Sequence, residues 1–184
     1  MVVPAAGSGR RMGGQSKPFL ELAGRPVLLH ALEALLADAR VEIVVVALAP
    51  GHAGAPPAWL GELDARIRIV VGGATRGHSV RNALAALPAD LDLIGVHDAA
   101  RPLVTAALVG RCIERAATGV GAVAGTPAVD TIKRVGEADR VVETPDRTVL
   151  WHAHTPQIFP AAVLREAYGP SVEVGVATDD SALV

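Results

Sequence analysis

Short runs of β-branched residues alternate along the chain with segments in which apolar residues recur at helical spacing. Residues 42–48 (EIVVVAL) form a continuous apolar run, which is typical of a strand buried on both faces of a parallel sheet. Residues 26–39 predict an amphipathic helix, because their apolar side chains fall on one stripe. The same patterns predict strands at 2–3, 67–71, 91–96 and 122–124 and helices at 79–87, 105–117 and 160–168. This alternation predicts an α/β sandwich with a mostly parallel sheet.

A different pattern interrupts the alternation after Ala128. Residues 131–134 and 141–144 read as two short alternating strands around residues 136–139, so we expect a β-hairpin inserted into the α/β frame. The inserted arm covers about residues 129–150. Because an isolated hairpin is marginally stable in water, we expect the arm to pack against another surface, with a second subunit as one candidate.

The remaining segments give two further expectations. Residues 52–58 (HAGAPPA) read as a surface loop, and Thr178-Asp179-Asp180 is expected to cap the start of a last helix. The sequence shows no internal repeat and no linker, so residues 1–184 are expected to form one domain.

Composition and charge narrow the class of protein. A net charge of −2 and a pI near 6.3 argue against a nucleic-acid partner and against a polybasic membrane patch. Cys112 is the single cysteine, which excludes an internal disulfide and a multi-cysteine metal site. No apolar run approaches the roughly 20 residues of a membrane span, and nothing resembles a signal peptide. We therefore expect a soluble cytoplasmic protein without membrane contact.

A glycine-rich segment, residues 5–17 (AAGSGRRMGGQSK), follows the first predicted strand. Glycines let backbone N–H groups approach phosphate oxygens, and Arg11 and Lys17 can neutralise the charge of a triphosphate. The segment lacks the Gly-Lys-Ser/Thr of a Walker loop, and Met12 holds the third glycine position of the dinucleotide fingerprint. It therefore favours a phosphate loop of another kind, with a surface loop carrying incidental cations as the alternative.

His97 and Asp98 follow the fourth predicted strand. In an open α/β sheet ligands bind beyond the carboxyl ends of the strands, and an Asp there can hold Mg²⁺ together with phosphate oxygens and water. A helix-capping role is the alternative for Asp98. For His97 we expect packing or support of a neighbour, since the sequence has no G-x-S-x-G nucleophile motif.

Seven segments together resemble the 2-C-methyl-D-erythritol 4-phosphate cytidylyltransferase family of the non-mevalonate isoprenoid pathway. They are PAAGSGRRM (4–12), Lys17, GGATRGHSV (72–80), HDAARP (97–102), DTIKR (130–134), DR followed by LWHAHTPQ (146–157), and TDD-SAL (178–183). The first is shared with sugar-nucleotide transferases, whereas HDAARP with LWHAHTPQ is far more specific. The resemblance implies a Rossmann-like three-layer nucleotidyltransferase fold and cytidylyl transfer from CTP to 2-C-methyl-D-erythritol 4-phosphate, with Mg²⁺ as cofactor.

The resemblance also implies roles for individual residues. Arg11 and Lys17 would stabilise transition-state charge, Arg147 would act both in catalysis and in substrate binding, and Asp98 would hold Mg²⁺. The nucleotide would be bound by Ala5, Ala6, Gly7, Gly73, Ser79 and Asp98, and the methylerythritol phosphate by Arg101, Thr131, Arg147 and Thr155. The arm at 130–150 would join two subunits into a homodimer.

Alternatives stay open at this point. Ser79 is also a candidate helix N-cap, and Arg147 a candidate for a surface salt bridge. Ribitol-5-phosphate cytidylyltransferase shares most of the scaffold, and a nucleotide-binding module without activity is a rival from another class.

Three departures from the family pattern bear on these expectations. Ser16-Lys17-Pro18 stands where the family usually has Pro-Lys-Gln, and Gly77 stands where a Gln is common. The family pattern also starts before Val2 and continues past Val184, into a part that holds a second metal-binding Asp and a substrate-positioning Lys. We therefore expect this sequence to be part of a longer protein, with a fused cyclodiphosphate synthase domain left open.

Overall fold

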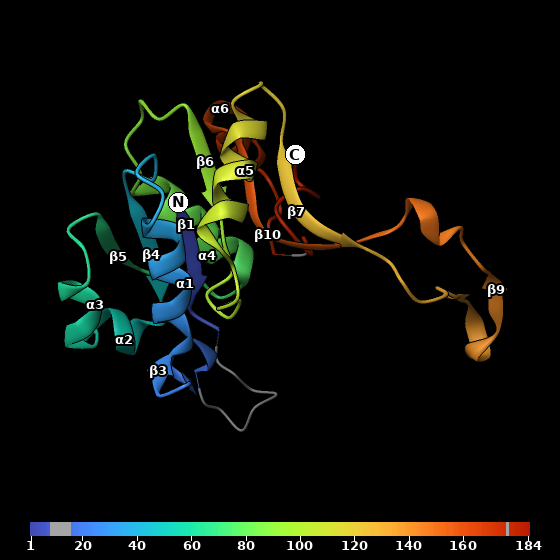
Figure 1. Ribbon diagram of the computed structural model, residues 1–184, viewed down its shortest axis with the longest axis horizontal. Helices are drawn as coiled ribbons and strands as arrows, with labels where there is room; N and C mark the ends of the chain where they lie inside the picture. The colour runs from blue at the N-terminus through green and yellow to red at the C-terminus, as the bar shows by residue number, and fades with distance from the viewer. Residues whose placement is uncertain (8–15, 176) are drawn as a thin grey trace.

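A six-stranded sheet forms the centre of the molecule in the computed structural model, which describes residues 1–7, 16–175 and 177–184 (Figure 1). The strand order is β5-β4-β1-β6-β10-β7. The strands are β1 (Val2–Ala5), β4 (Val44–Leu48), β5 (Ile67–Val71), β6 (Leu93–Val96), β7 (Ala122–Pro127) and β10 (Trp151–Pro160). β1 pairs in parallel with β4 and β6, and β4 in parallel with β5, whereas β10 runs antiparallel to β6 and β7. The predicted α/β class with a mostly parallel sheet is confirmed.

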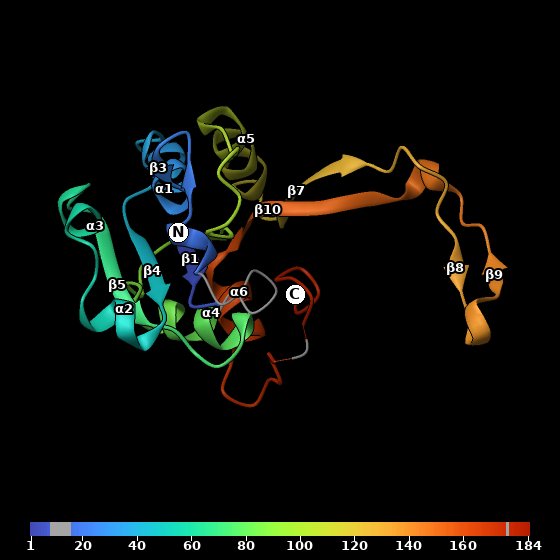
Figure 2. The ribbon, with the colours of Figure 1, turned by 90° about the horizontal axis from the view of Figure 1, so that it is seen from below.

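Helices cover both faces of the sheet, so that the domain has three layers (Figure 2). Helices α1 (Val27–Leu36) and α5 (Ala106–Ala116) lie on one face, and α4 (Arg76–Ala85) and α6 (Ala161–Ala167) on the other. Every residue of β4 is buried, and its alternate side chains enter two separate apolar clusters. This is why the apolar run of β4 is continuous rather than alternating.

The parallel strands bring their carboxyl ends to one edge of the sheet. β1, β4, β5 and β6 end there, and the loops that follow them carry most of the candidate residues. β10 also reaches this edge, because Gln157 pairs with Val96 at the end of β6.

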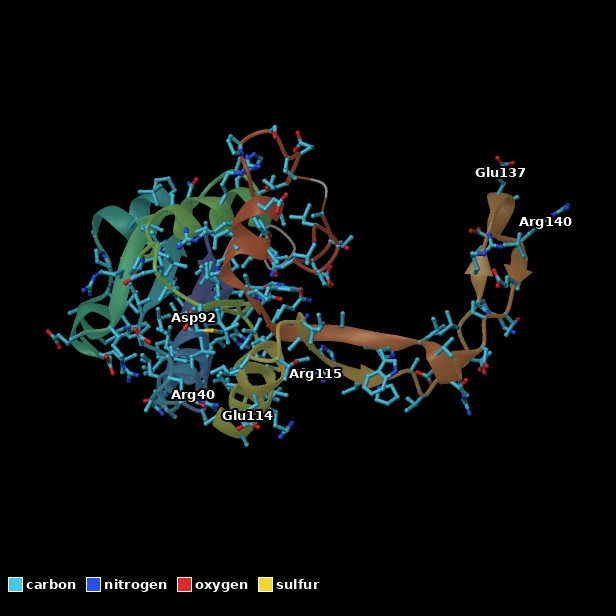
Figure 3. The ribbon with its side chains drawn as sticks, turned by 90° about the horizontal axis from the view of Figure 1, so that it is seen from above. Arg40, Asp92, Glu114, Arg115, Glu137 and Arg140 are labelled. Atoms are coloured by element: carbon cyan, nitrogen blue, oxygen red, sulfur yellow. The ribbon has the colours of Figure 1, made fainter. Side chains whose placement is uncertain are left out.

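The inserted hairpin extends from the body as an arm (Figure 1). It contains β8 (Arg134–Val135), the 3₁₀ turn η3 (Glu137–Asp139), β9 (Val141–Glu143) and the 3₁₀ turn η4 (Arg147–Val149). Figure 3 shows Glu137 and Arg140 at its far end. The hairpin prediction is confirmed, although its strands are shorter than the predicted 131–134 and 141–144. The large apolar side chains that the arm and its base expose are Val129, Val135, Val141, Val142, Val149 and Trp151.

Two local predictions are wrong. Residues 52–58 were expected to form a loop, but most of them belong to α2 (Pro50–Gly54) and α3 (Ala58–Glu62). Pro50 occupies a first-turn position where its missing N–H costs nothing, and the fully buried Leu60 anchors α3. The helix expected after Thr178 is absent, since residues 177–184 form bends and turns in which the Asp179 carboxylate accepts from the Ala182 amide (3.0 Å).

Several elements have no counterpart in the prediction. The ten-residue strand β10 is one, and the small hairpin β2 (Glu21–Leu22) and β3 (Arg25–Pro26) is another. The hairpin turns through Ala23 and Gly24, whose φ angles are 52° and 74°. None of the helices in the described part of the chain combines the length and the apolar character needed to cross a membrane.

Candidate active site

The loops after β1 and β5 meet across the end of β4. A Cβ atom added to Gly72 would lie 2.4 Å from the Ala6 Cβ, and one added to Gly73 would lie 2.3 Å from the His78 Cβ. The Gly72 amide donates to the Leu48 carbonyl at 2.7 Å. Gly72 is therefore required for the close approach of these two loops, and Gly73 for the close approach of the β5 loop to helix α4.

Ser79 fastens this junction from helix α4. Its Oγ accepts a hydrogen bond from the Gly73 amide (3.1 Å) and donates to the Thr75 carbonyl (2.9 Å). Thr75, not Ser79, is the helix N-cap, because its hydroxyl accepts from the His78 amide. The structure thus brings together Ala6, Gly73 and Ser79 of the predicted nucleotide pocket, and the N-cap alternative for Ser79 is wrong.

Ala5, Gly7 and Lys17 are the other candidate residues of the predicted phosphate loop that the structure describes. Ala5 is the buried last residue of β1, and Gly7 is exposed two residues later. Lys17 is exposed and opens the 3₁₀ turn η2 (Lys17–Phe19), in which Phe19 stacks on His52 of α2 at 4.5 Å between ring centroids. Arg11 lies outside the described residues.

Asp98 lies just beyond β6, between two guanidinium groups. Its Oδ1 accepts from Arg76 Nε (2.9 Å) and its Oδ2 from Arg101 Nε (3.0 Å). Burial raises the pKa of Asp98, but the charge of Arg76 and the hydrogen bond of Arg101 outweigh burial, so that the pKa lies below its ordinary value. Asp98 is therefore a fixed carboxylate, and it caps no helix among the described residues, contrary to the alternative.

His97 and Thr155 hold the backbone on either side of this carboxylate. The Asp98 amide donates to Thr155 Oγ1 (3.1 Å), which lies 3.0 Å from His97 Nδ1, and His97 Nε2 lies 3.2 Å from the Arg101 carbonyl. A neutral His97 with its proton on Nε2 satisfies every member of this chain. Burial lowers the pKa of the fully buried His97, which agrees with that state. His97 thus has the supporting role expected from the sequence.

Arg101 is also held from β10. Its NH1 group lies 2.9 Å from His154 Nδ1, and His154 Nε2 lies 3.2 Å from Thr126 Oγ1 of β7. Asp98, Arg101 and Thr155, predicted separately, are thereby parts of one hydrogen-bonded cluster. The cluster can accept an anion beside a carboxylate that can bind a cation.

Sequence reasoning missed three members of the cluster. Arg76 also donates to both oxygens of Asp180, at 3.0 and 2.7 Å, and the Tyr168 hydroxyl donates to Asp180 at 2.6 Å. Asp180 is completely buried. The available signal was that Arg76 and Asp180 fall inside two of the quoted motifs, but they are 104 residues apart and nothing local pairs them.

Thr131 and Arg147 are not brought to this cluster. Both are exposed on the arm, which leads away from the sheet (Figure 2). Arg147 donates to the Val129 carbonyl at 2.5 Å and forms no salt bridge within the described residues. The salt-bridge alternative for Arg147 is therefore not observed.

Asp98 is the candidate Mg²⁺ ligand, and its carboxylate would have to share the ion with other ligands. Across residues 1–7, 16–175 and 177–184, no three His, Cys, Asp or Glu side chains are grouped as a metal cage. Asp98 offers one carboxylate whose two oxygens each keep a free lone pair after accepting from Arg76 and Arg101. Mg²⁺ is commonly held by one or two carboxylates with phosphates and water, so the site suits an ion that arrives with a nucleotide.

The three-layer fold with charged side chains at the carboxyl edge is typical of a Rossmann-like nucleotidyltransferase. The family model described as 2-C-methyl-D-erythritol 4-phosphate cytidylyltransferase matches residues 1–184. The chain belongs to that family.

Individual relatives agree with this assignment. The 2-C-methyl-D-erythritol 4-phosphate cytidylyltransferase of Symbiobacterium thermophilum is 43% identical over 186 residues, covering 100% of this chain and 78% of the relative. The bifunctional enzyme IspD/IspF of Anaeromyxobacter dehalogenans is 46% identical over 189 residues, and the match covers all of this chain and 48% of that protein. The crystal structure of 4-diphosphocytidyl-2C-methyl-D-erythritol synthase from Anaerococcus prevotii superposes with a TM-score of 0.87 at 27% identity, covering 99% of this chain and 78% of that one.

Proposed function

We propose that this chain transfers the cytidylyl group of CTP to 2-C-methyl-D-erythritol 4-phosphate. The products are 4-diphosphocytidyl-2-C-methyl-D-erythritol and pyrophosphate. The proposal is supported by the juxtaposition, at one sheet edge, of the loops that meet at Ala6 and Gly72 with the Asp98–Arg101–Thr155 cluster. Since CTP is a cytoplasmic metabolite, the proposal places the protein in the cytoplasm.

The reaction needs no covalent enzyme intermediate. A phosphate oxygen of the methylerythritol phosphate attacks the α-phosphorus of CTP in line, a new P–O bond forms, and the bond to the β-phosphate breaks to release pyrophosphate. In such phosphoryl transfers the protein contributes positioning and electrostatic stabilisation.

The nucleotide is assigned to the edge formed by β1, β5 and α4. Ala5, Ala6 and Gly7 supply main-chain groups at the end of β1, and Gly73 supplies a loop whose position Ser79 fixes. Because these loops are packed to contact, their backbone groups form a rigid surface on which the cytosine edge can be recognised.

The triphosphate is assigned to cations from two sources. Arg11 and Lys17 stabilise the charge that develops on the phosphates, and Lys17 is exposed at the same edge. Asp98 would hold Mg²⁺, which would supply further positive charge to stabilise the phosphates.

The second substrate is assigned to Arg101 and Thr155 together with two arm residues. Arg101 is held by Asp98 and His154 with 42% of its side chain exposed, and its guanidinium can donate hydrogen bonds to the substrate phosphate. Thr131 and Arg147 belong to the exposed arm, which extends away from the sheet (Figures 1 and 2), so we assign them to the site of a second subunit in a homodimer.

A substrate panel tests the proposed activity. Pyrophosphate release is measured with CTP, UTP and ATP, each combined with 2-C-methyl-D-erythritol 4-phosphate or D-ribitol 5-phosphate. We expect release with CTP and methylerythritol phosphate at least tenfold faster than with any other pair. Preference for ribitol phosphate would assign the chain to the other cytidylyltransferase, and CTP binding by calorimetry without release would leave a binding module.

A further inference from the structure

Arg76 joins three separate parts of the chain at the site. It is the first residue of α4, Asp98 follows β6, and Asp180 belongs to the segment after α6. The Arg76 guanidinium donates through Nε to Asp98 Oδ1 at 2.9 Å and through both NH groups to the Asp180 carboxylate at 3.0 and 2.7 Å. Each of its three nitrogens therefore donates to a carboxylate of this chain.

Asp180 holds Arg76 from a fully buried position. Its carboxylate accepts the two Arg76 bonds and the Tyr168 hydroxyl, and its amide donates to Gln157 Oε1 at 3.1 Å. A buried carboxylate that is bidentate with an arginine has one geometry, because both planar groups must remain aligned. Burial lowers the pKa of Arg76, but the hydrogen bonds and charge of Asp180 outweigh burial and raise the pKa above its ordinary value. Arg76 is thus permanently charged and immobile.

The fixed position of Arg76 in turn fixes the orientation of the Asp98 carboxylate. Arg76 and Arg101 each take one of its oxygens, and Thr155 accepts from its backbone amide, so that both the plane and the backbone of this carboxylate are fixed. Within the described residues, the Arg101 side chain is hydrogen-bonded only to Asp98 and His154, and we assign it to the substrate phosphate. Arg76 has no such assignment, so its bond to Asp98 can persist when the substrate binds.

We infer that Arg76 is a positioning residue for the transfer reaction, held by Asp180, which orients the Asp98 carboxylate toward the Mg²⁺–triphosphate. This inference rests on the proposed assignment of Asp98 as the magnesium ligand. Arg76 and Asp180 have no role in that assignment. Groups that orient a metal-binding carboxylate typically cost 10–100-fold in metal affinity or activity when they are removed.

Arg81 offers a matched control on the same helix. Its guanidinium donates to the carbonyls of Tyr168, Gly169 and Val172, and so it fastens the segment after α6 onto α4 without contacting Asp98. Arg81→Met removes an arginine that docks the same segment. An effect that comes only from looser packing of the segment after α6 on α4 should therefore appear in both Arg76→Met and Arg81→Met.

The experiment measures metal binding directly, on the full chain. Mn²⁺ binding to the enzyme–CTP complex is followed by electron paramagnetic resonance, together with the Mg²⁺ concentration for half-maximal activity and the thermal unfolding midpoint. We expect Arg76→Met to weaken Mn²⁺ binding and to raise the Mg²⁺ requirement by about 10–100-fold. Arg81→Met should leave both within about twofold while lowering the unfolding midpoint. Equal metal effects in the two variants, or none in Arg76→Met, would overturn the inference.

A double-mutant cycle separates this inference from the assignment on which it rests. If Arg76 acts through Asp98, adding Arg76→Met to Asp98→Asn changes Mn²⁺ affinity by less than about twofold, because the effects are not additive. Additive effects would contradict the inference alone. If Asp98→Asn itself leaves metal binding unchanged, the magnesium assignment fails, and the role of Arg76 fails with it.

A second variant and a metal-free binding measurement complete the test of Arg76. Should Arg76→Met not fold, Asp180→Asn keeps the volume of the buried partner and removes its charge, and we expect it to weaken Mn²⁺ binding at least about tenfold. CTP affinity in EDTA should be unchanged in Arg76→Met. A loss of metal-free CTP binding would make Arg76 a direct nucleotide contact and would overturn its positioning role.

Discussion

Lys17 stands at the start of a 3₁₀ turn whose Phe19 is stacked on His52 of α2. Two of the 17 basic residues in the chain are lysines, and the other, Lys133, is bonded to Thr144 on the arm. An ammonium is a compact point charge, unlike the planar guanidinium that the chain uses elsewhere. The position and the residue type agree with the proposal that Lys17 stabilises the charge that develops on the triphosphate.

We predict that Lys17→Ala lowers kcat by about 10²–10³, the usual loss for one preorganised charge-stabilising donor. KM for CTP should change much less, because the interaction is strongest in the transition state. Lys17→Arg should also be impaired. Steady-state kinetics on the three proteins decide the matter, and near-normal turnover of Lys17→Ala would remove Lys17 from the chemistry.

His97 makes stability depend on pH. Since burial lowers its pKa in the folded state, the unfolded chain binds more protons than the folded chain below the ordinary His value of about 6.5. Stability should therefore fall as the pH falls from about 6.5 toward the folded-state pKa, by up to about 1.4 kcal/mol per pH unit. Urea unfolding at pH 7.5 and 5.5 measures the loss, and His97→Gln should abolish most of the difference. The same pH dependence in both proteins would assign it to other groups.

At the residue scale the sequence identified groups that lie next to strand ends, and it missed those that pair across the fold. Asp98 was predictable because it directly follows an apolar strand, and Ser79 because it belongs to a motif. Asp180 was predicted to cap a helix, yet it is buried against Arg76, a residue 104 positions away. Only the folded topology places these two side chains together.

Helix α4 and the segment after α6 pack closely at Gly77. A Cβ at this position would lie 2.0 Å from the Val174 carbonyl oxygen, a contact that no rotamer can relieve. Gly77→Ala therefore sets the steric cost against the higher helix propensity of alanine, which is worth about 1 kcal/mol. The steric cost should exceed the gain in helix propensity, because the main chain at Val174 must move to admit the Cβ atom.

We predict that Gly77→Ala destabilises the protein by about 1–3 kcal/mol in urea unfolding. Gly61→Ala is the matched control, since Gly61 is an exposed residue of α3 with no atom within 4 Å of an added Cβ. The control should be neutral or stabilising by up to about 1 kcal/mol. Stabilisation by Gly77→Ala would show that the segment after α6 does not rest on α4.

Strands and helices were predicted correctly from the sequence where uniform burial gives a clear hydrophobic pattern. β4 is covered on both faces and reads as an unbroken apolar run. β10 was missed because its ten residues serve two environments, exposed at Trp151–Ala153 and buried from Thr155 to Phe159, and because they include two prolines. α2 and α3 are five residues each, too short to show helical periodicity.

The arm is the feature that bears on how the whole molecule assembles. Its valines are largely exposed, with Val149 75% and Val142 53% accessible, and a two-stranded hairpin cannot bury them alone. The structure leaves Thr131 and Arg147 away from Asp98, so a site that uses all three needs two subunits. A two-fold interface would present each arm to the opposite body and would produce two equivalent sites.

We predict a homodimer in sedimentation and restored activity in a mixed dimer. Arg147→Ala and Asp98→Asn subunits, each inactive alone, should recover activity together, because one site then carries both defects and the other carries neither. A verified heterodimer without recovery would place Arg147 in the site of its own subunit. A monomeric active protein would contradict the role of the arm.

The proposed transfer of the cytidylyl group from CTP to 2-C-methyl-D-erythritol 4-phosphate can be followed by ³¹P NMR of the reaction. In the presence of Mg²⁺ we predict that the CTP resonances are replaced by the paired signals of a diphosphodiester and by pyrophosphate in equal amounts. Asp98→Asn at the same Mg²⁺ concentration should form both products much more slowly. Unchanged CTP, or hydrolysis to CMP and pyrophosphate without the diphosphodiester, would contradict the account.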